Sequence, residues 1–369
     1  MAFNPKTITI YSVGLLGGSI GLALRNSGFT GRIIGLSSPE KVQCALKLGC
    51  IDEGFPYSKL SETVSRTDLL ILCSPISVII KTIEELAAMP LPKGLVITDV
   101  GSTKQTICTT AAEKLPSPAY FIGGHPMAGS EKSGPSAADP YLFQNAIHVL
   151  TPANGAASGK DLEIARFFEH HLGSRTLFLD PARHDRMVAA VSHLPHLLAV
   201  ALVNEAQHAE AGMPGTLNLA AGGFRDMTRI AGSPYDLWHD ILLTNKNALS
   251  PLIDRMVERL TDIKRRLSND SLSELFEQSR KTRSHIPINS KGFIRQLSEV
   301  LVVAKDQPGV IARIATSLAA EKININDMEV LKVREGEGGT IRLAFDSAAA
   351  AGKAAAVLHK AGFQARERI

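Results

Sequence analysis

This 369-residue sequence lacks the usual marks of membrane, secreted and nucleic-acid-binding proteins. No basic segment followed by an apolar run opens the chain, and we expect no apolar segment of membrane-spanning length. The four cysteines, Cys44, Cys50, Cys73 and Cys108, form no C-x-x-C pair, which is typical of reduced thiols in a cytosolic protein. The net charge is only +4, and the basic residues in 255–266 are interleaved with acids, which argues against phosphate binding. The sequence therefore predicts a cytoplasmic protein that binds neither membranes nor nucleic acid.

The first half of the chain alternates apolar strand patterns with helical patterns. Strands are expected at residues 7–13, 32–37, 68–75, 94–102 and 119–122, and later at 147–150 and 175–179 on either side of a helix around 162–172. Such alternation favours an α/β, Rossmann-like domain with a doubly wound parallel sheet. We expect this domain to end near Asp180-Pro181.

The first strand runs into a glycine-rich turn that resembles a dinucleotide-binding fingerprint. Gly14 would let the backbone approach a pyrophosphate, and Gly17 would allow close helix packing. However, Ser12 occupies the position of the first glycine of the fingerprint, and Ser37 occupies the position where an NAD-binding domain normally has a carboxylate. Lys41 lies within reach of a 2′-phosphate but no arginine does, so the choice between NAD and NADP stays open.

The loop expected over residues 123–134 carries one histidine and one carboxylate, His125 and Glu131. Because it follows the strand at 119–122, we expect His125 where the sheet opens into a loop, at the edge where such sheets bind ligands. The alternative is a plain turn with a structural histidine.

Residues 182–283 lack strand patterns and carry long apolar helical stripes. By analogy with other enzymes, an all-α domain that buries these stripes between two subunits is expected. His193 and His196 have the spacing of a metal pair, but no third histidine or cysteine ligand accompanies them, so we expect no metal.

Polar residues from 281 to 291 suggest a linker. Beyond it we expect a small separate domain of the βαββαβ, ferredoxin-like type. Its strands are expected at 297–304, 323–333, 340–345 and 364–367, with helices at 310–321 and in the alanine-rich segment that precedes the last strand.

Several ordered motifs resemble the prephenate dehydrogenase family, with a C-terminal ACT domain, over nearly the whole chain. They are Gly14-Leu15-Leu16-Gly17-Gly18-Ser19, Asp99-Val100-Gly101-Ser102-Thr103-Lys104, Gly124-His125-Pro126-Met127-Ala128-Gly129-Ser130-Glu131, Ser192-His193-Leu194-Pro195-His196 and Gly222-Gly223-Phe224-Arg225-Asp226-Met227-Thr228-Arg229. The resemblance implies oxidation of prephenate by NAD(P)+ to 4-hydroxyphenylpyruvate and CO2 in tyrosine biosynthesis, with NAD the cofactor that the family favours.

The resemblance also implies roles for individual residues. His125 would accept the proton of the substrate's C4 hydroxyl, and Ser102 would orient it, although Ser102 would also suit a helix N-cap. Substrate contacts would come from His196, Arg229, Glu131 and Trp238. For Glu131 the alternative is an exposed loop acid, and for Trp238 it is a core residue. Cofactor contacts would come from Gly14, Leu15, Leu16, Gly17, Ser37, Ser74 and Pro75.

The expected domains are a nucleotide-binding domain at 1–180, a helical substrate and dimerisation domain at 181–284, a linker at 285–295 and an ACT domain at 296–369. In that family the ACT domain binds an amino acid, here expected to be tyrosine. The implied effector contacts are Asp306, Pro308, Gly309, Val310, Asn324 and Ile325. The alternatives are a ligand-free dimerisation module for this domain and, for the chain, an arogenate or dual-specificity dehydrogenase, a β-hydroxyacid dehydrogenase or an inactive amino-acid sensor.

Overall fold

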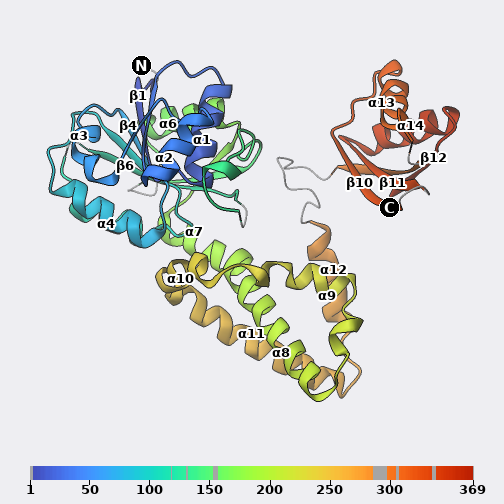
Figure 1. The fold of residues 1–369 in the computed structure, drawn as a ribbon. Helices are drawn as coiled ribbons and strands as arrows, with labels where there is room; N and C mark the ends of the chain where they lie inside the picture. The colour runs from blue at the N-terminus through green and yellow to red at the C-terminus, as the bar shows by residue number, and fades with distance from the viewer. Residues whose placement is uncertain are drawn as a thin grey trace. The chain divides into compact units, whose positions relative to one another are not determined.

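The computed structural model describes residues 3–117, 119–129, 132–152, 157–285, 297–304, 307–334 and 338–368. The chain divides into two compact units, residues 1–272 and 273–369. Figure 1 shows both units, which are described separately below.

An eight-stranded sheet forms the centre of the first unit, in the order β3-β2-β1-β4-β5-β6-β7-β8. Its strands are β1 (Thr7–Tyr11), β2 (Arg32–Leu36), β3 (Glu53–Phe55), β4 (Leu69–Leu72), β5 (Val96–Asp99), β6 (Tyr120–Pro126), β7 (Ile147–Pro152) and β8 (Arg175–Phe178). Neighbouring strands are parallel except β6 and β7, which are antiparallel, so the sheet is mixed rather than purely parallel. The short β3 was not predicted.

Helices cover both faces of this sheet, as the strand sequences require. On β4, Leu69 and Ile71 pack into the core on one face, while Leu70 and Leu72 pack into the core on the other. Strands buried on both faces are apolar at every position, and this is the pattern that the sequence carries. The first face is covered by α1 (Leu15–Asn26), α2 (Pro39–Lys47) and α6 (Gly159–Leu172). The second is covered by α3 (Leu60–Val64), α4 (Ile76–Ala87) and α5 (Gln105–Lys114).

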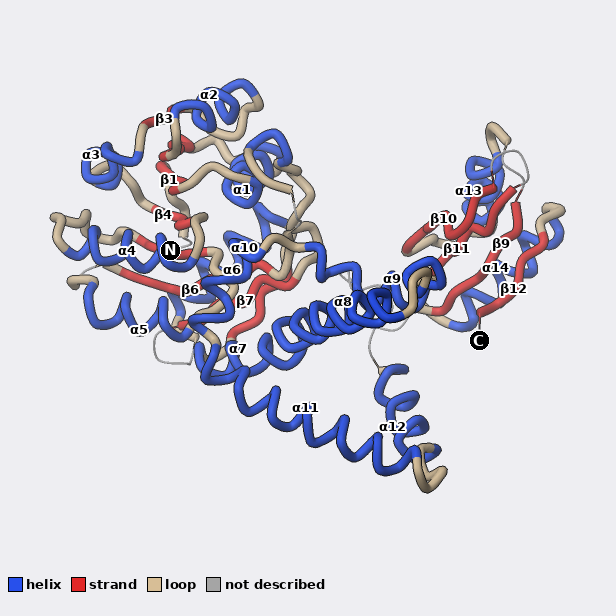
Figure 2. Tube along the Cα trace, turned by 60° about the horizontal axis from the view of Figure 1, so that its bottom comes forward, coloured by secondary structure: helices blue, strands red, loops and turns tan. Residues whose placement is uncertain are grey.

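The second half of this unit is helical, as expected. It comprises α7 (Pro181–Val188), the π-helical turn η3 (Ala189–His193), α8 (Leu194–Gly212), η4 (Thr216–Leu219), α9 (Gly222–Thr228), η5 (Arg229–Gly232), α10 (Tyr235–Thr244) and α11 (Lys246–Leu267). Pro195 has no N–H to donate, which accounts for the π-helical turn just before it. Figure 2 shows α8 and α11 as the two longest of these helices.

The continuous helical segment Pro181–Gly212 corrects one sequence expectation. It is 32 residues long, and its most apolar window has a mean hydropathy of 1.6, so by length and composition alone it is long and apolar enough to cross a membrane. The expectation that no apolar segment reaches that length was therefore wrong.

The helical domain has few buried apolar residues for its size. Its apolar cluster has only three buried members, Ala189, Leu194 and Leu249, while Val191 and Leu219 are 73% and 83% exposed. Helices whose apolar residues stay exposed in one chain are typical of an interface with another chain.

The second unit contains α12 (Ser273–Ser284) and a four-stranded antiparallel sheet in the order β10-β11-β9-β12. Its other elements are β9 (Ser298–Ala304), α13 (Val310–Ala320), β10 (Asp327–Arg334), β11 (Gly338–Phe345), α14 (Ala348–Lys360) and β12 (Gln364–Arg368). Figure 1 shows α13 and α14 on one face of this sheet, where alternate strand residues such as Val300 and Leu343 are buried. The βαββαβ expectation is confirmed, although β10 begins later than predicted.

Candidate active site

His125 lies within β6, not in a loop. The strand continues through residues 123–126 because it pairs with β7, where His125 is opposite Val149. The histidine is buried, and its Nδ1 lies 2.9 Å from Nε2 of His184 on α7. Nδ1 of His184 in turn lies 2.8 Å from Oδ1 of Asp185. His125, His184 and Asp185 thus form a buried chain of hydrogen bonds, which we call the histidine relay.

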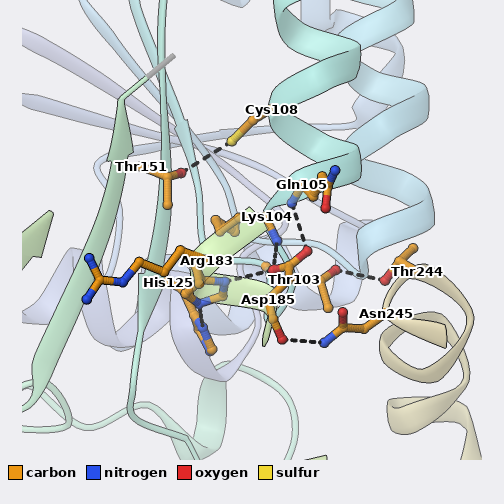
Figure 3. A network of polar contacts seen from close by, with 12 residues as sticks. Thr103, Lys104, Gln105, Cys108, His125, Thr151, Arg183, Asp185, Thr244 and Asn245 are labelled. Carbon is orange, nitrogen blue, oxygen red and sulfur yellow. Dashed lines mark hydrogen bonds and ion pairs between the residues drawn. The ribbon is translucent and has the colours of Figure 1, made fainter. Parts of the chain in front are cut away.

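The Asp185 carboxylate also holds the first turn of α5. It accepts hydrogen bonds from the backbone N–H of Lys104 at 2.7 Å and of Gln105 at 2.9 Å. Figure 3 shows these contacts converging on Asp185. The interpretation of Ser102 as the cap of this helix was wrong, because Lys104 occupies the N-cap position and a distant carboxylate satisfies the free donors. Ser102 lies partly buried just after β5.

A buried ion pair fixes the strand ends beside His125. Lys104 Nζ contacts Asp99 Oδ2, and both side chains are completely buried. Lys104 also donates to the Gly124 carbonyl at 2.8 Å, and Asp99 accepts from the N–H groups of Gly101 and Gly124 at 2.8 and 3.1 Å. Only glycine fits at position 124, since a Cβ there would lie 2.5 Å from the Asp99 carbonyl oxygen. The ion pair and its hydrogen bonds therefore fix the end of β5, the adjacent part of β6 and the start of α5 relative to one another.

Burial sets the protonation of the histidines at this site. It holds the pKa of His125 well below its usual value, and the positive charge of nearby Lys104 acts in the same direction. Burial likewise lowers the pKa of His193 to about 4 and that of His148 to about 3. His125 is consequently a neutral imidazole at neutral pH, the form that accepts a proton.

The helical domain contributes an aromatic stack and an amide bridge. The ring of His196 stacks on Trp238 with centroids 3.6 Å apart and planes inclined by 17°. Nδ2 of Asn245 lies 3.0 Å from Nδ1 of His193 and donates to the Asp185 carbonyl at 2.8 Å. Two of the predicted substrate residues, His196 and Trp238, are thus in contact with each other.

The predicted substrate residue Arg229 does not contact the histidine relay in the part of the chain that the structure describes. Arg229 is the first residue of η5, which packs against α8, and it is exposed. Within the described ranges, no hydrogen bond or ion pair links Arg229 to the histidine relay. Glu131 and Asp306 lie outside the described residues.

The turn between β1 and α1 fits a dinucleotide. A Cβ at Gly14 would meet nothing within 4 Å, so the backbone there is open to a ligand. At Gly17 a Cβ would lie 2.4 Å from the Ser12 carbonyl oxygen, so glycine is required for α1 to approach β1. No side chain caps the N-terminus of α1, which leaves its first N–H groups for phosphate oxygens.

Sequence reasoning missed His184, Asp185 and Asn245. The sequence signals for them were weak: a histidine-aspartate pair just after the predicted domain boundary, and an asparagine between two helices. They join the site through contacts with residues distant in the chain: 59 positions away for His184, 81 and 80 for Asp185 and 52 for Asn245.

The chain has a Rossmann-type sheet with an open glycine turn, a buried histidine at the ligand edge of the sheet and a helical second domain. Together these features define a nicotinamide-dependent dehydrogenase. Three family models match this chain: the prephenate dehydrogenase nucleotide-binding domain over residues 20–177, the prephenate dehydrogenase dimerization domain over 180–281 and the ACT domain over 298–361. The chain belongs to the prephenate dehydrogenase family.

Similar proteins agree with this assignment. The chain is 37% identical to a prephenate dehydrogenase of Bacillus subtilis over 92% of each chain, and 32% identical to a cyclohexadienyl dehydrogenase of Zymomonas mobilis over 61% of this chain and 77% of that one. Among solved structures, it is similar to prephenate dehydrogenase from Aquifex aeolicus in complex with hydroxyphenyl propionate and NAD+, with 31% identity and a TM-score of 0.68 over 77% of this chain and 98% of that one. Arogenate dehydrogenase from Synechocystis gives 31% identity and a TM-score of 0.64 over 75% and 98%.

Proposed function

We propose that this protein catalyses the NAD(P)+-dependent oxidative decarboxylation of prephenate to 4-hydroxyphenylpyruvate and CO2 in tyrosine biosynthesis. The observation that carries the proposal is the histidine relay, which presents a neutral imidazole at the ligand edge of the sheet. Family membership and the similar prephenate dehydrogenases support the substrate.

The relay supports Nε2 of His125 as the nitrogen that acts as the base. Asp185 is an acceptor, so Nδ1 of His184 carries a hydrogen and Nε2 of His184 has a lone pair. Nδ1 of His125 therefore donates to His184, and Nε2 of His125 keeps the lone pair that takes the proton of the substrate's C4 hydroxyl. The Asp185 carboxylate stabilises the positive charge that then develops on the two rings.

The cofactor, when bound, supplies the acceptor for the hydride that leaves C4. We assign its phosphates to the backbone of Gly14, Leu15, Leu16 and Gly17, and its other contacts to Ser37, Ser74 and Pro75. NAD is our preferred cofactor. The open turn at Gly14 and the uncapped N-terminus of α1 support this assignment.

Prephenate is a dianion, so its recognition requires fixed donors or cations. We assign Arg229 to a substrate carboxylate through paired, charge-assisted hydrogen bonds. We assign His196, held against Trp238, to the side chain, Ser102 to the C4 hydroxyl and Glu131 to closure of the site. Burial lowers the pKa of His196, which favours a neutral hydrogen-bonding ring.

We further propose a cytoplasmic homodimer formed through the helical domain. The exposed apolar residues of that domain and its match to a dimerization-domain model support this assembly. The proposed domain boundaries remain 1–180, 181–284, a linker at 285–295 and 296–369. The compact unit that begins at residue 273 includes α12, so the boundary at 284 stays a prediction.

Tyrosine is the effector that we propose for the ACT domain. Gly309 has a φ of +87° and caps α13 without a side chain, which leaves backbone N–H groups for a carboxylate. Pro308, Val310, Asn324 and Ile325 would complete the contacts with Asp306. Nearby, the buried Oδ1 of Asn326 has no hydrogen-bond partner among the described residues, so it would suit a ligand donor such as an ammonium group.

A steady-state assay with prephenate and arogenate tests the catalytic proposal. We expect prephenate to give reduced cofactor and CO2 in equal amounts, with the higher kcat/KM of the two substrates. The similarity to arogenate dehydrogenase makes arogenate the second candidate. An arogenate preference above about tenfold, or about 1.4 kcal/mol in transition-state binding, would contradict the prephenate assignment.

Regulation is tested by removing residues 296–369. We expect tyrosine to inhibit the full chain and to have no effect on the truncated one, because the effector contacts are lost. The activity of the truncated chain without tyrosine is the control. Inhibition that survives truncation would place the tyrosine site elsewhere.

A further inference from the structure

Four hydroxyl groups meet at the ligand edge of the sheet, beside the glycine turn. Ser74 Oγ donates to Ser12 Oγ at 2.6 Å, Ser12 Oγ lies 2.8 Å from the Tyr57 hydroxyl, and that hydroxyl lies 3.4 Å from Ser37 Oγ. These residues follow β1, β2, β3 and β4, so four neighbouring strands contribute one hydroxyl each. We call Ser12, Ser37, Tyr57 and Ser74 the hydroxyl cluster.

The cluster explains how a serine replaces the first glycine of the fingerprint. Ser12 has a φ of +72°, a left-handed conformation that non-glycine residues rarely adopt. Its side chain is bonded on both sides, to Ser74 and to Tyr57, and these contacts hold the strained turn. Tyr57 is itself held by packing on Tyr11, with ring centroids 4.9 Å apart.

The hydroxyl cluster has no charge where nucleotide-binding domains usually place one. Serine and tyrosine hydroxyls both donate and accept, which suits a ribose hydroxyl but does not offset a 2′-phosphate. The nearby cations Lys59 and Arg66 are paired with Glu62 and Glu53. In the first turn of α2, the exposed Lys41 is adjacent to Glu40, whose pKa is lowered by bonds to its own N–H and to Ser38.

We propose that Tyr57 is a cofactor-specificity residue: with Ser37 it binds the adenosine ribose hydroxyls and so favours NAD over NADP. The inference rests on the proposed function, which requires a nicotinamide cofactor. The Tyr57–Ser37 contact at 3.4 Å is longer than an ordinary O–H···O hydrogen bond. A ribose hydroxyl that lies closer to the Tyr57 hydroxyl would therefore form the stronger hydrogen bond. Tyr57 is 38% exposed and within reach of a ligand.

Equilibrium titration of the full chain with NAD+ and NADP+ by calorimetry tests the proposal without relying on turnover. Wild type should bind NAD+ more tightly. Tyr57→Phe should weaken NAD+ binding by about three- to tenfold, the usual effect of one lost hydrogen bond. Tyr57→Arg, at a partly exposed position, should bind NADP+ at least about tenfold better relative to NAD+, because it adds a bidentate phosphate donor.

Tyr120→Phe is the matched control, since its hydroxyl bonds to Asp161 at 2.7 Å at the start of β6, away from the cofactor edge. It should leave both affinities unchanged. Wild-type preference for NADP+, or Tyr57 variants with an unchanged ratio of affinities, would overturn the inference while the dehydrogenase proposal stands. Failure to bind either cofactor would overturn both.

Discussion

Replacing His125 with asparagine is expected to lower kcat by about 10²- to 10⁴-fold, the range typical for loss of a general base. Asparagine retains a polar group near His184 but offers no basic nitrogen for the substrate proton. Because the change removes a proton acceptor rather than a binding surface, the affinity for NAD+ should stay at the wild-type value. Steady-state kinetics and cofactor titration together measure this separation.

The dependence of kcat/KM on pH distinguishes loss of the general base from a defect in folding. Burial lowers the pKa of His125, so wild-type kcat/KM should stay high at neutral pH and fall only when acid protonates the imidazole. The residual activity of His125→Asn should lack that acid limb. His170→Asn, on the exposed side of α6, is the control and should behave as wild type. Wild-type turnover in His125→Asn would refute the mechanism.

Replacing Lys104 with methionine is expected to destabilise the first unit by about 3–5 kcal/mol, the usual cost of leaving a buried charge without its partner. Methionine fills a similar volume, but Asp99 would remain completely buried without its cation. The N–H groups of Gly101 and Gly124 offset only part of this cost. Urea denaturation followed by circular dichroism measures the change in the free energy of unfolding.

Two further variants test whether the unpaired buried charge of Asp99 causes the loss of stability in Lys104→Met. Lys59→Met breaks the exposed Lys59–Glu62 pair, whose side chains are 52% and 57% exposed, and should leave the urea midpoint unchanged. Adding Asp99→Asn to Lys104→Met removes the second charge and should recover part of the lost stability. If Lys104→Met unfolds at the same midpoint as Lys59→Met, the ion pair does not stabilise the site.

Much of the fold is specified by local patterns in the sequence. Local patterns predict β4 and β5 from their apolar runs, the turn after β1 from its glycines and the strands of the C-terminal unit from their alternation. The reason is that burial on one or two faces of an element sets the spacing of apolar residues in its sequence. The ordered motifs were also enough to identify the family, which the family models confirm.

The ends of elements were less predictable. Residues 123–126 look like a loop because glycine and proline are poor strand formers, but pairing with β7 extends β6 through His125. Likewise, Ser102 looks like a helix cap, yet the Asp185 carboxylate, 80 or 81 positions further along the chain, satisfies the first N–H groups of α5. Long-range contacts override local propensity in both places.

The sequence by itself determined the Rossmann-like sheet, the helical domain and the ACT domain, and it predicted His125 as the candidate base. Only the tertiary structure decided what surrounds that histidine: His184 and Asp185 behind it, the buried Lys104–Asp99 pair beside it and the hydroxyl cluster at the same sheet edge. The physical reason is that periodicity records which face of an element is buried. It does not record which polar side chains from distant elements meet there to form the hydrogen bonds and ion pairs of the site.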